Sequence, residues 1–173
     1  ITAELLNESY ARQYLGGAGL AARYLYDRID AQTDPLGPDN PLIFMTGPLD
    51  ATSAPSSGRF VVVARSPQTG IYGEANAGNF FGPDLKFAGY DGIIVRGKSS
   101  APVYLYIRDD LVELRDATHL RGKTTFETGD AIRAESNDPN LTIAAIGPAG
   151  ENLVKYAIIL ASIALSGWTM FLY

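Results

Sequence analysis

Short apolar runs separated by turn residues alternate with segments whose apolar positions recur at helical spacing. Runs with β-branched or aromatic residues predict strands over residues 42–45, 60–64, 71–73, 93–95, 103–108, 111–114 and 141–146. Helical spacing and capping residues predict helices over residues 9–15, 20–29, 83–89 and 124–135. Residues 1–5 have the pattern of the middle or end of a further strand. This mixture of elements predicts an α+β domain.

One order of elements occurs twice along the chain. A helical segment, an Asp-Pro pair, an apolar strand and a Gly-Pro pair follow one another over residues 7–48 and again over residues 117–148. Two matched units about a hundred residues apart indicate an internal duplication, and chance similarity between two helix–strand pairs is the alternative. The duplication predicts an α+β fold made of two similar sheet-and-helix halves.

Charge and composition exclude several classes of function. The 173 residues carry a net charge of −5, and the basic residues are scattered singly. The chain therefore lacks the basic stripe that binding to DNA or RNA requires. The absence of cysteine excludes a disulfide framework, a thiolate zinc site and a thiolate-bound iron–sulfur cluster within these residues. The single histidine, His119, falls in a turn after a predicted strand, which favours a surface or capping role over catalysis.

Both ends of the chain are unusual. The chain begins with Ile1 and has no basic signal segment, so we expect a piece of a longer, cytoplasmic protein. Residues 156–173 contain no charged side chain across eighteen positions, which just reaches the length of a membrane-spanning helix. The favoured interpretation is a final core strand over residues 154–160. Residues 1–160 then form the domain, and residues 161–173 form an atypical uncharged tail.

Two loops have backbones that a ligand could approach. Residues 53–59 are small except for Arg59, which stands where a strand begins, and a guanidinium can grip phosphate with two parallel hydrogen bonds. Residues 73–79 bring Asn76, Ala77 and Gly78 together, where backbone amides and an amide side chain could hold an anion or a polar heterocycle. Plain turns and a solvated arginine are the alternatives. Neither loop matches a glycine motif for nucleotides.

Glu74 and Asp84 are candidates for a pair of carboxylates. Nothing in their spacing fixes the distance between them, so we interpret both as structural. Asp84 falls in the first turn of the helix predicted from Pro83, where a negative charge is stabilised by the helix dipole.

Seven segments of the chain match, in order and spacing, the motifs of one known family. They are Asp34-Pro35-Leu36-Gly37-Pro38, Thr46-Gly47-Pro48-Leu49, Thr52-Ser53-Ala54-Pro55 with Gly58-Arg59, Ser66-Pro67-Gln68-Thr69-Gly70, Ala75-Asn76-Ala77-Gly78, Asp84-Leu85-Lys86-Phe87-Ala88-Gly89-Tyr90-Asp91 and Ile146-Gly147-Pro148-Ala149-Gly150-Glu151-Asn152. With these motifs the chain resembles the N-terminal domain of the aldehyde ferredoxin oxidoreductase family. So many separate motifs in register make the resemblance specific.

The resemblance implies a fold, a cofactor and a reaction. The family's first domain is a duplicated α+β fold on which a tungsten, or sometimes molybdenum, bis-pyranopterin (molybdopterin) cofactor rests. By this resemblance Arg59 binds the cofactor's phosphate, while Asn76, Ala77 and Gly78 hold the pterin, and Asn76 also holds the Mg²⁺ that bridges the two phosphates. The implied reaction oxidises a small aldehyde to a carboxylate and passes two electrons through a [4Fe–4S] cluster to ferredoxin.

The chain also departs from the family's pattern. Residues 161–168 contain no arginine, whereas the family has an arginine- and glycine-rich stretch there that contacts the second pterin. Asn79 stands where family members usually have glycine, so the shape of that loop stays open. The cluster cysteines and the proton-handling residues belong to the family's downstream domains, so these residues alone are expected to be inactive.

Two other functions stay open beside an aldehyde oxidoreductase. One is a truncated, non-catalytic binding or assembly domain, held at a membrane through residues 156–173. The other is a relative with a different substrate, such as the tungsten subunit of an aromatic-ring-reducing complex. The sequence is compatible with a monomer or a homodimer.

Overall fold

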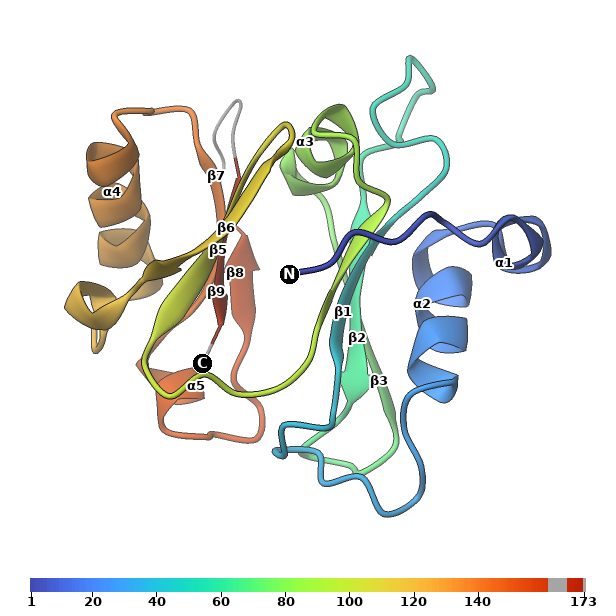
Figure 1. Ribbon diagram of the computed structural model, residues 1–173, viewed down its shortest axis with the longest axis horizontal. Helices are drawn as coiled ribbons and strands as arrows, with labels where there is room; N and C mark the ends of the chain where they lie inside the picture. The colour runs from blue at the N-terminus through green and yellow to red at the C-terminus, as the bar shows by residue number, and fades with distance from the viewer. Residues whose placement is uncertain (162–167, 173) are drawn as a thin grey trace.

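Two β-sheets face each other in the computed structural model, which describes residues 1–161 and 168–172 (Figure 1). The first sheet has the order β3-β2-β1-β4 and is antiparallel throughout. Its strands are β1 (Leu42–Thr46), β2 (Phe60–Arg65), β3 (Tyr72–Ala77) and β4 (Gly92–Val95). The second sheet has the order β6-β5-β9-β7-β8, and its one parallel pair among the described residues joins β7 to β9. Its strands are β5 (Val103–Arg108), β6 (Leu111–Asp116), β7 (Thr142–Ile146), β8 (Ile159–Ala161) and β9 (Trp168–Leu172).

Helices cover the outer faces of the two sheets. Helices α1 (Glu8–Tyr14) and α2 (Gly17–Tyr26) flank the first sheet, and α4 (Thr125–Ser136) flanks the second (Figure 1). Helix α3 (Phe81–Phe87) contacts both β1 and β7, so it joins the two sheets at one end. The remaining elements are α5 (Pro148–Glu151) and a 3₁₀ helix, η1 (Thr118–Leu120). The expected α+β fold with two sheet-and-helix halves is confirmed.

Alternating side chains of the central strands divide the core into three layers. In β1, Phe44 packs between the sheets, whereas Ile43 packs against α2. In β7, Ala144 packs between the sheets, whereas Ile143 packs on the α4 side. Successive side chains of a strand point to opposite faces, so each central strand supplies two layers at once. The equivalent division in β1 and β7 agrees with the duplication expected from the sequence.

Capping contacts explain where two of the predicted helices begin and end. Helix α4 begins with a complete capping box, in which the Thr124 hydroxyl accepts from the Glu127 N–H while the Glu127 carboxylate accepts from the Thr124 N–H. Asn137 ends this helix in the left-handed conformation. Helix α1 begins one residue before the predicted Ser9, because the Asn7 side chain accepts a hydrogen bond from the Tyr10 N–H.

Several predicted boundaries are wrong. Residues 1–5 form no strand, and all five are exposed. Strand β3 continues through Ala77, so most of the segment expected to be a loop after Gly73 is paired with β2. Helix α3 begins at Phe81, two residues before Pro83. The last predicted strand, over residues 154–160, is shortened to Ile159–Ala161.

The uncharged C-terminal stretch contributes strands rather than a membrane helix where the structure describes it. Strand β9 lies between β5 and β7 in the second sheet. Residues 162–167 and 173 of the expected tail lie outside the described residues. No described helix has the length and apolar character that crossing a bilayer requires. The division into a domain over residues 1–160 and a tail over residues 161–173 stays a prediction.

Candidate functional site

The two candidate loops meet at one end of the first sheet. The register pairs Thr46 with Phe60 across β1 and β2, and pairs Phe60 with Ala77 across β2 and β3. Neighbouring antiparallel strands run in opposite directions, so the end of β1, the start of β2 and the end of β3 lie side by side. The sheet therefore brings Arg59, which immediately precedes β2, next to Asn76.

Arg59 is held in place by Asn76 through two hydrogen bonds. Its Nε donates to the Asn76 side-chain Oδ1, and its Nη2 donates to the Asn76 backbone oxygen at 3.2 Å. Both hydrogen bonds lie at the exposed surface of the protein. No carboxylate among the described residues forms an ion pair with Arg59, although eight such pairs occur elsewhere in that part of the chain. This guanidinium therefore keeps its full charge available to an anion from solvent.

Gly78 leaves space beside this guanidinium. A Cβ atom at position 78 would lie 3.4 Å from Nη1 of Arg59, in van der Waals contact with it, so glycine leaves that side of the guanidinium uncovered. Ala77 differs from its neighbours because its side chain packs against the layer between the sheets. Only the backbone of Ala77 can therefore face a ligand. Together these features fit a phosphate group, which a guanidinium binds through two N–H groups at a backbone that lets it approach.

A bound metal ion would need ligands from elsewhere than the protein's acidic side chains. Across residues 1–161, no group of three or more histidine, cysteine, aspartate or glutamate residues could hold a metal ion. Asn76 offers two oxygen atoms, and both accept hydrogen bonds from Arg59. Mg²⁺ commonly takes only one or two protein oxygens and completes its shell with phosphates and water. The two Asn76 oxygens are therefore compatible with Mg²⁺ only if phosphate supplies further ligands.

Asp50 organises the loop that leads to Arg59, and the sequence patterns assigned no role to it. Its carboxylate accepts hydrogen bonds from the Gly47 N–H at 2.7 Å and from the Gly58 N–H at 2.5 Å. The residue is 4% exposed, so these two backbone donors replace water around a buried charge. The contact joins the end of β1 to the residue before Arg59. A single acidic residue within a run of small, neutral loop residues is the signal that could have identified it.

Asn79 continues the site toward the second sheet. Its backbone φ is 107°, in the region that favours glycine, which accounts for the glycine expected at this position in the family. Its side-chain oxygen accepts a hydrogen bond from the Phe80 N–H, and its Nδ2 donates to the Ala161 oxygen at 3.3 Å. The sequence did not determine the shape of this loop, and the structure shows that the Asn79 side chain itself holds it.

The other sequence candidates lie apart from Arg59. Glu74 accepts a hydrogen bond from the Tyr72 hydroxyl on β3, and burial together with this carboxylate raises the pKa of Tyr72 to about 12. Asp84 lies in the first turn of α3 and accepts a hydrogen bond from Thr142. His119 lies in η1, is half-exposed and has its Nε2 at 3.3 Å from Oε2 of Glu135. The structural role of Asp84 and the surface position of His119 agree with the sequence.

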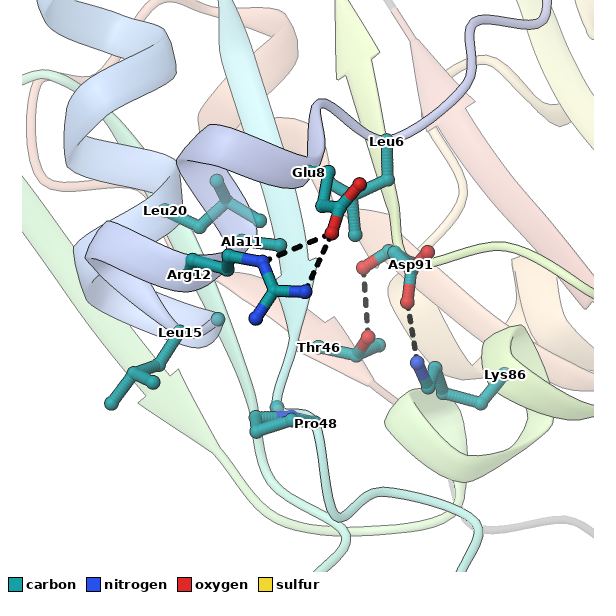
Figure 2. A pocket seen from close by; sticks show the side chains of 12 residues that line it. Leu6, Glu8, Ala11, Arg12, Leu15, Leu20, Thr46, Pro48, Lys86 and Asp91 are labelled. Atoms are coloured by element: carbon teal, nitrogen blue, oxygen red, sulfur yellow. Dashed lines mark hydrogen bonds and ion pairs between the residues drawn. The ribbon is translucent and has the colours of Figure 1, made fainter.

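A cavity of about 450 Å³ lies beside the same end of the first sheet, between α1 and α3 (Figure 2). Its charged side chains pair with each other: Arg12 with Glu8 at 2.6 Å, and Lys86 with Asp91. The Thr46 hydroxyl also donates to the Asp91 backbone oxygen at 2.7 Å (Figure 2). Both cations of this cavity are therefore neutralised within the protein, in contrast to Arg59.

Comparisons with known proteins give the family. The family model described as "Aldehyde ferredoxin oxidoreductase, N-terminal domain" matches residues 1–167. The chain is 53% identical to the tungsten-containing aldehyde ferredoxin oxidoreductase of Thermococcus kodakarensis and 51% identical to that of Pyrococcus furiosus, in each case over 92% of this chain and 26% of the relative. The chain thus spans about a quarter of the length of these relatives.

A solved structure shares the same fold. It is the active site complex BamBC of benzoyl coenzyme A reductase, bound to 1,5-dienoyl-CoA, which superposes with a TM-score of 0.89 at 42% identity. The match covers 96% of this chain and 28% of that chain. With the family model, the relatives and the fold in agreement, the chain belongs to the aldehyde ferredoxin oxidoreductase family, in the part that forms the N-terminal domain.

Proposed function

We propose that this chain is the cofactor-binding N-terminal domain of a tungsten-dependent aldehyde:ferredoxin oxidoreductase. The observation that carries the proposal is the Arg59 guanidinium, which has no carboxylate partner among the described residues and lies beside Asn76 and Gly78. Membership of the family and the tungsten named for two relatives support tungsten as the metal. The bound group is a bis-pyranopterin that carries phosphate.

Each residue of the loop has a separate part in holding this group. Arg59 turns its N–H groups from Asn76 to a phosphate, because a charged acceptor binds a guanidinium more strongly than an amide does. That change would free the side-chain and backbone oxygens of Asn76 to coordinate Mg²⁺. Gly78 keeps the space beside Arg59 open. Asp50 holds the preceding loop through its hydrogen bond with Gly58, and this fixes the position from which the Arg59 side chain extends.

For the whole protein we propose the reaction of its aldehyde ferredoxin oxidoreductase relatives. A bound tungsten cofactor supplies the two-electron oxidation of an aldehyde to a carboxylate, with the oxygen coming from water. The electrons then pass through a [4Fe–4S] cluster to ferredoxin. Because residues 1–173 contain no cysteine, thiolate ligands for the cluster must come from other parts of the protein. The domain's contribution is to bind and orient the cofactor.

A second candidate is a subunit that acts on an aromatic thioester instead of an aldehyde. The 42% identity to a chain of the benzoyl coenzyme A reductase complex supports it as the second candidate, behind the aldehyde ferredoxin oxidoreductases, which are 53% and 51% identical. The two candidates share the cofactor-binding role for this domain and differ in the substrate pocket. Assaying the full-length protein with small aldehydes and with an aromatic coenzyme A thioester separates them.

Metal analysis of the full-length protein tests the cofactor role directly. We expect close to one tungsten or molybdenum atom per chain, phosphorus in excess over the metal, and pterin fluorescence after oxidation. Arg59→Ala lowers the metal content, whereas Arg12→Ala does not, because Arg12 is an exposed arginine already paired with Glu8. A wild-type protein free of both metals and of pterin contradicts the proposal and supports the non-catalytic alternative.

A further inference from the structure

The segment between β3 and α3 is bonded to both sheets. Asn79 follows the Asn76–Gly78 segment directly, and its Nδ2 donates to the Ala161 oxygen, 82 positions away in the sequence. Ala161 is the last residue of β8, in the second sheet. One side chain thus connects the ligand-facing end of the first sheet to a strand end of the second sheet.

The backbone conformation of Asn79 is unusual for a residue that has a side chain. Its φ of 107° lies where a side chain is rarely found and where glycine fits without strain. An asparagine at such a position lowers stability unless its side chain makes compensating contacts. The two contacts present are the local one to the Phe80 N–H and the distant one to Ala161. Only the distant contact joins the two sheets.

A second hydrogen bond to the second sheet comes from the same connection between β3 and β4. The Thr142 hydroxyl of β7 donates to the Asp84 carboxylate of α3 at 2.5 Å. Asp84 and Asn79 belong to the same connection, so it is fastened to the second sheet at two points. Of these two points, the one at Asn79 is adjacent to Gly78 and therefore closer in sequence to the candidate phosphate site.

We propose that Asn79 is a positioning residue, whose hydrogen bond to Ala161 fixes the Arg59–Asn76–Gly78 end of the first sheet relative to the second sheet. The inference rests on the proposed function, because it concerns the geometry of the same cofactor site. Without the bond the two sheets keep their shared core, but the loop that holds the cofactor gains freedom. The cofactor is then retained less tightly.

Variants of the full-length chain separate this role from ordinary stabilisation. Asn79→Gly removes both side-chain contacts, to the Ala161 oxygen and to the Phe80 N–H, and also relieves the backbone strain, so thermal stability stays the same or rises. Hydrogen exchange over residues 76–80 becomes faster, and tungsten is lost on dialysis about tenfold faster, as is typical when an outer contact of a metal site is removed. Asn79→Ala keeps the strain without the bond, so it lowers thermal stability as well.

Asn137→Gly is the matched control. Asn137 also has a positive φ, of 49°, but it ends α4 on the outer side of the second sheet. We expect this variant to leave tungsten retention and exchange over residues 76–80 unchanged. If Asn79→Gly behaves like Asn137→Gly in both measurements, the positioning role is overturned.

Arg59→Ala distinguishes failure of this inference from failure of the proposed function. Tungsten retained by Arg59→Ala means that the proposed site is wrong. Tungsten lost by Arg59→Ala but retained by Asn79→Gly means that the site is right and the positioning role is wrong. In a protein without tungsten, unchanged hydrogen exchange in Asn79→Gly overturns the positioning role by itself.

Discussion

Thr142 and Asp84 form a hydrogen bond that joins the first turn of α3 to strand β7 of the second sheet. The Thr142 Oγ1 donates to Oδ2 of Asp84 at 2.5 Å, and Thr142 is fully buried. Burial raises the pKa of the Asp84 carboxyl, and the hydrogen bond from Thr142 lowers it by less. Burial of Asp84 therefore favours the protonated form of its carboxyl group over the carboxylate.

Replacing Asp84 by asparagine should change how stability depends on pH. The unfolded carboxyl releases its proton at a lower pH than the folded one, so native stability falls as the pH rises from the ordinary aspartate range through the raised pKa. The amide oxygen of the Asp84→Asn variant still accepts from Thr142, but the amide cannot ionise. The Tm of this variant relative to the wild type therefore increases over that interval and levels off above it. Parallel Tm curves between about pH 4 and pH 7 would show that the burial of Asp84 has no such effect.

Removing the Asp50 carboxylate should loosen the loop before Arg59. Asp50→Ala leaves the N–H groups of Gly47 and Gly58 without their acceptor, at a cost of about 1–3 kcal/mol for buried donors. We expect a lower Tm, faster proteolysis within residues 51–57 and reduced metal content. Asp39→Ala, at an exposed pair with Arg96, serves as the control and should change none of these.

Arg65 should not tolerate replacement by lysine. Its Nη1 donates to the backbone oxygens of Asp30, Ala31 and Thr33, and its Nε donates to that of Gly70. Lysine has no planar fork to reach these two groups of acceptors together, so Arg65→Lys should lower stability by about 1.5–3 kcal/mol. Hydrogen exchange over residues 30–40 checks this, with Arg96→Lys as the exposed control. Equal exchange in both variants would contradict the role given to Arg65.

Gly92 should be essential to the pairing of β1 with β4. A Cβ atom at this position would lie 2.6 Å from the Phe44 backbone oxygen, which cannot move without breaking the sheet. Gly92→Ala should therefore lower the free energy of unfolding by about 1–3 kcal/mol. At Gly147 the nearest atom to a Cβ is a side-chain methyl of Thr125 at 3.5 Å, so Gly147→Ala should be tolerated. Chemical denaturation compares the two.

The strands with clear apolar patterns were predictable because both of their faces are covered. Phe44 and Ile43 face different layers of the core, and the local run of apolar residues reports that directly. Strand β3 was underestimated because glycine, alanine, glutamate and asparagine are uncommon in strands, yet pairing with β2 imposes the extended conformation on them. Tertiary pairing there outweighs local preference.

The sequence singled out the residues of the candidate site, but not the contacts that support them. Arg59 and Asn76 stood out because of the small residues around them, and the family resemblance added their roles. The bond from Asn79 to Ala161 spans 82 positions, and Asp50 reaches Gly58 across a loop. Neither contact leaves a periodic signal in the sequence, since the first depends on how the two sheets are placed in space and the second on the path of the loop between β1 and β2. The roles of Arg59, Asn76, Ala77 and Gly78 in binding the cofactor stay predictions.

Helix α3 makes the two sheet-and-helix halves dependent on each other. By chain order it belongs with the first half, but Phe81 and Leu85 lie in one apolar cluster with Ile107 and Ala144 of the second. A polypeptide ending after β4 would leave this cluster open to water, and so would one beginning at β5. Cleavage at the exposed residues 98–101 would accordingly yield two pieces that complement one another rather than two small proteins that fold alone.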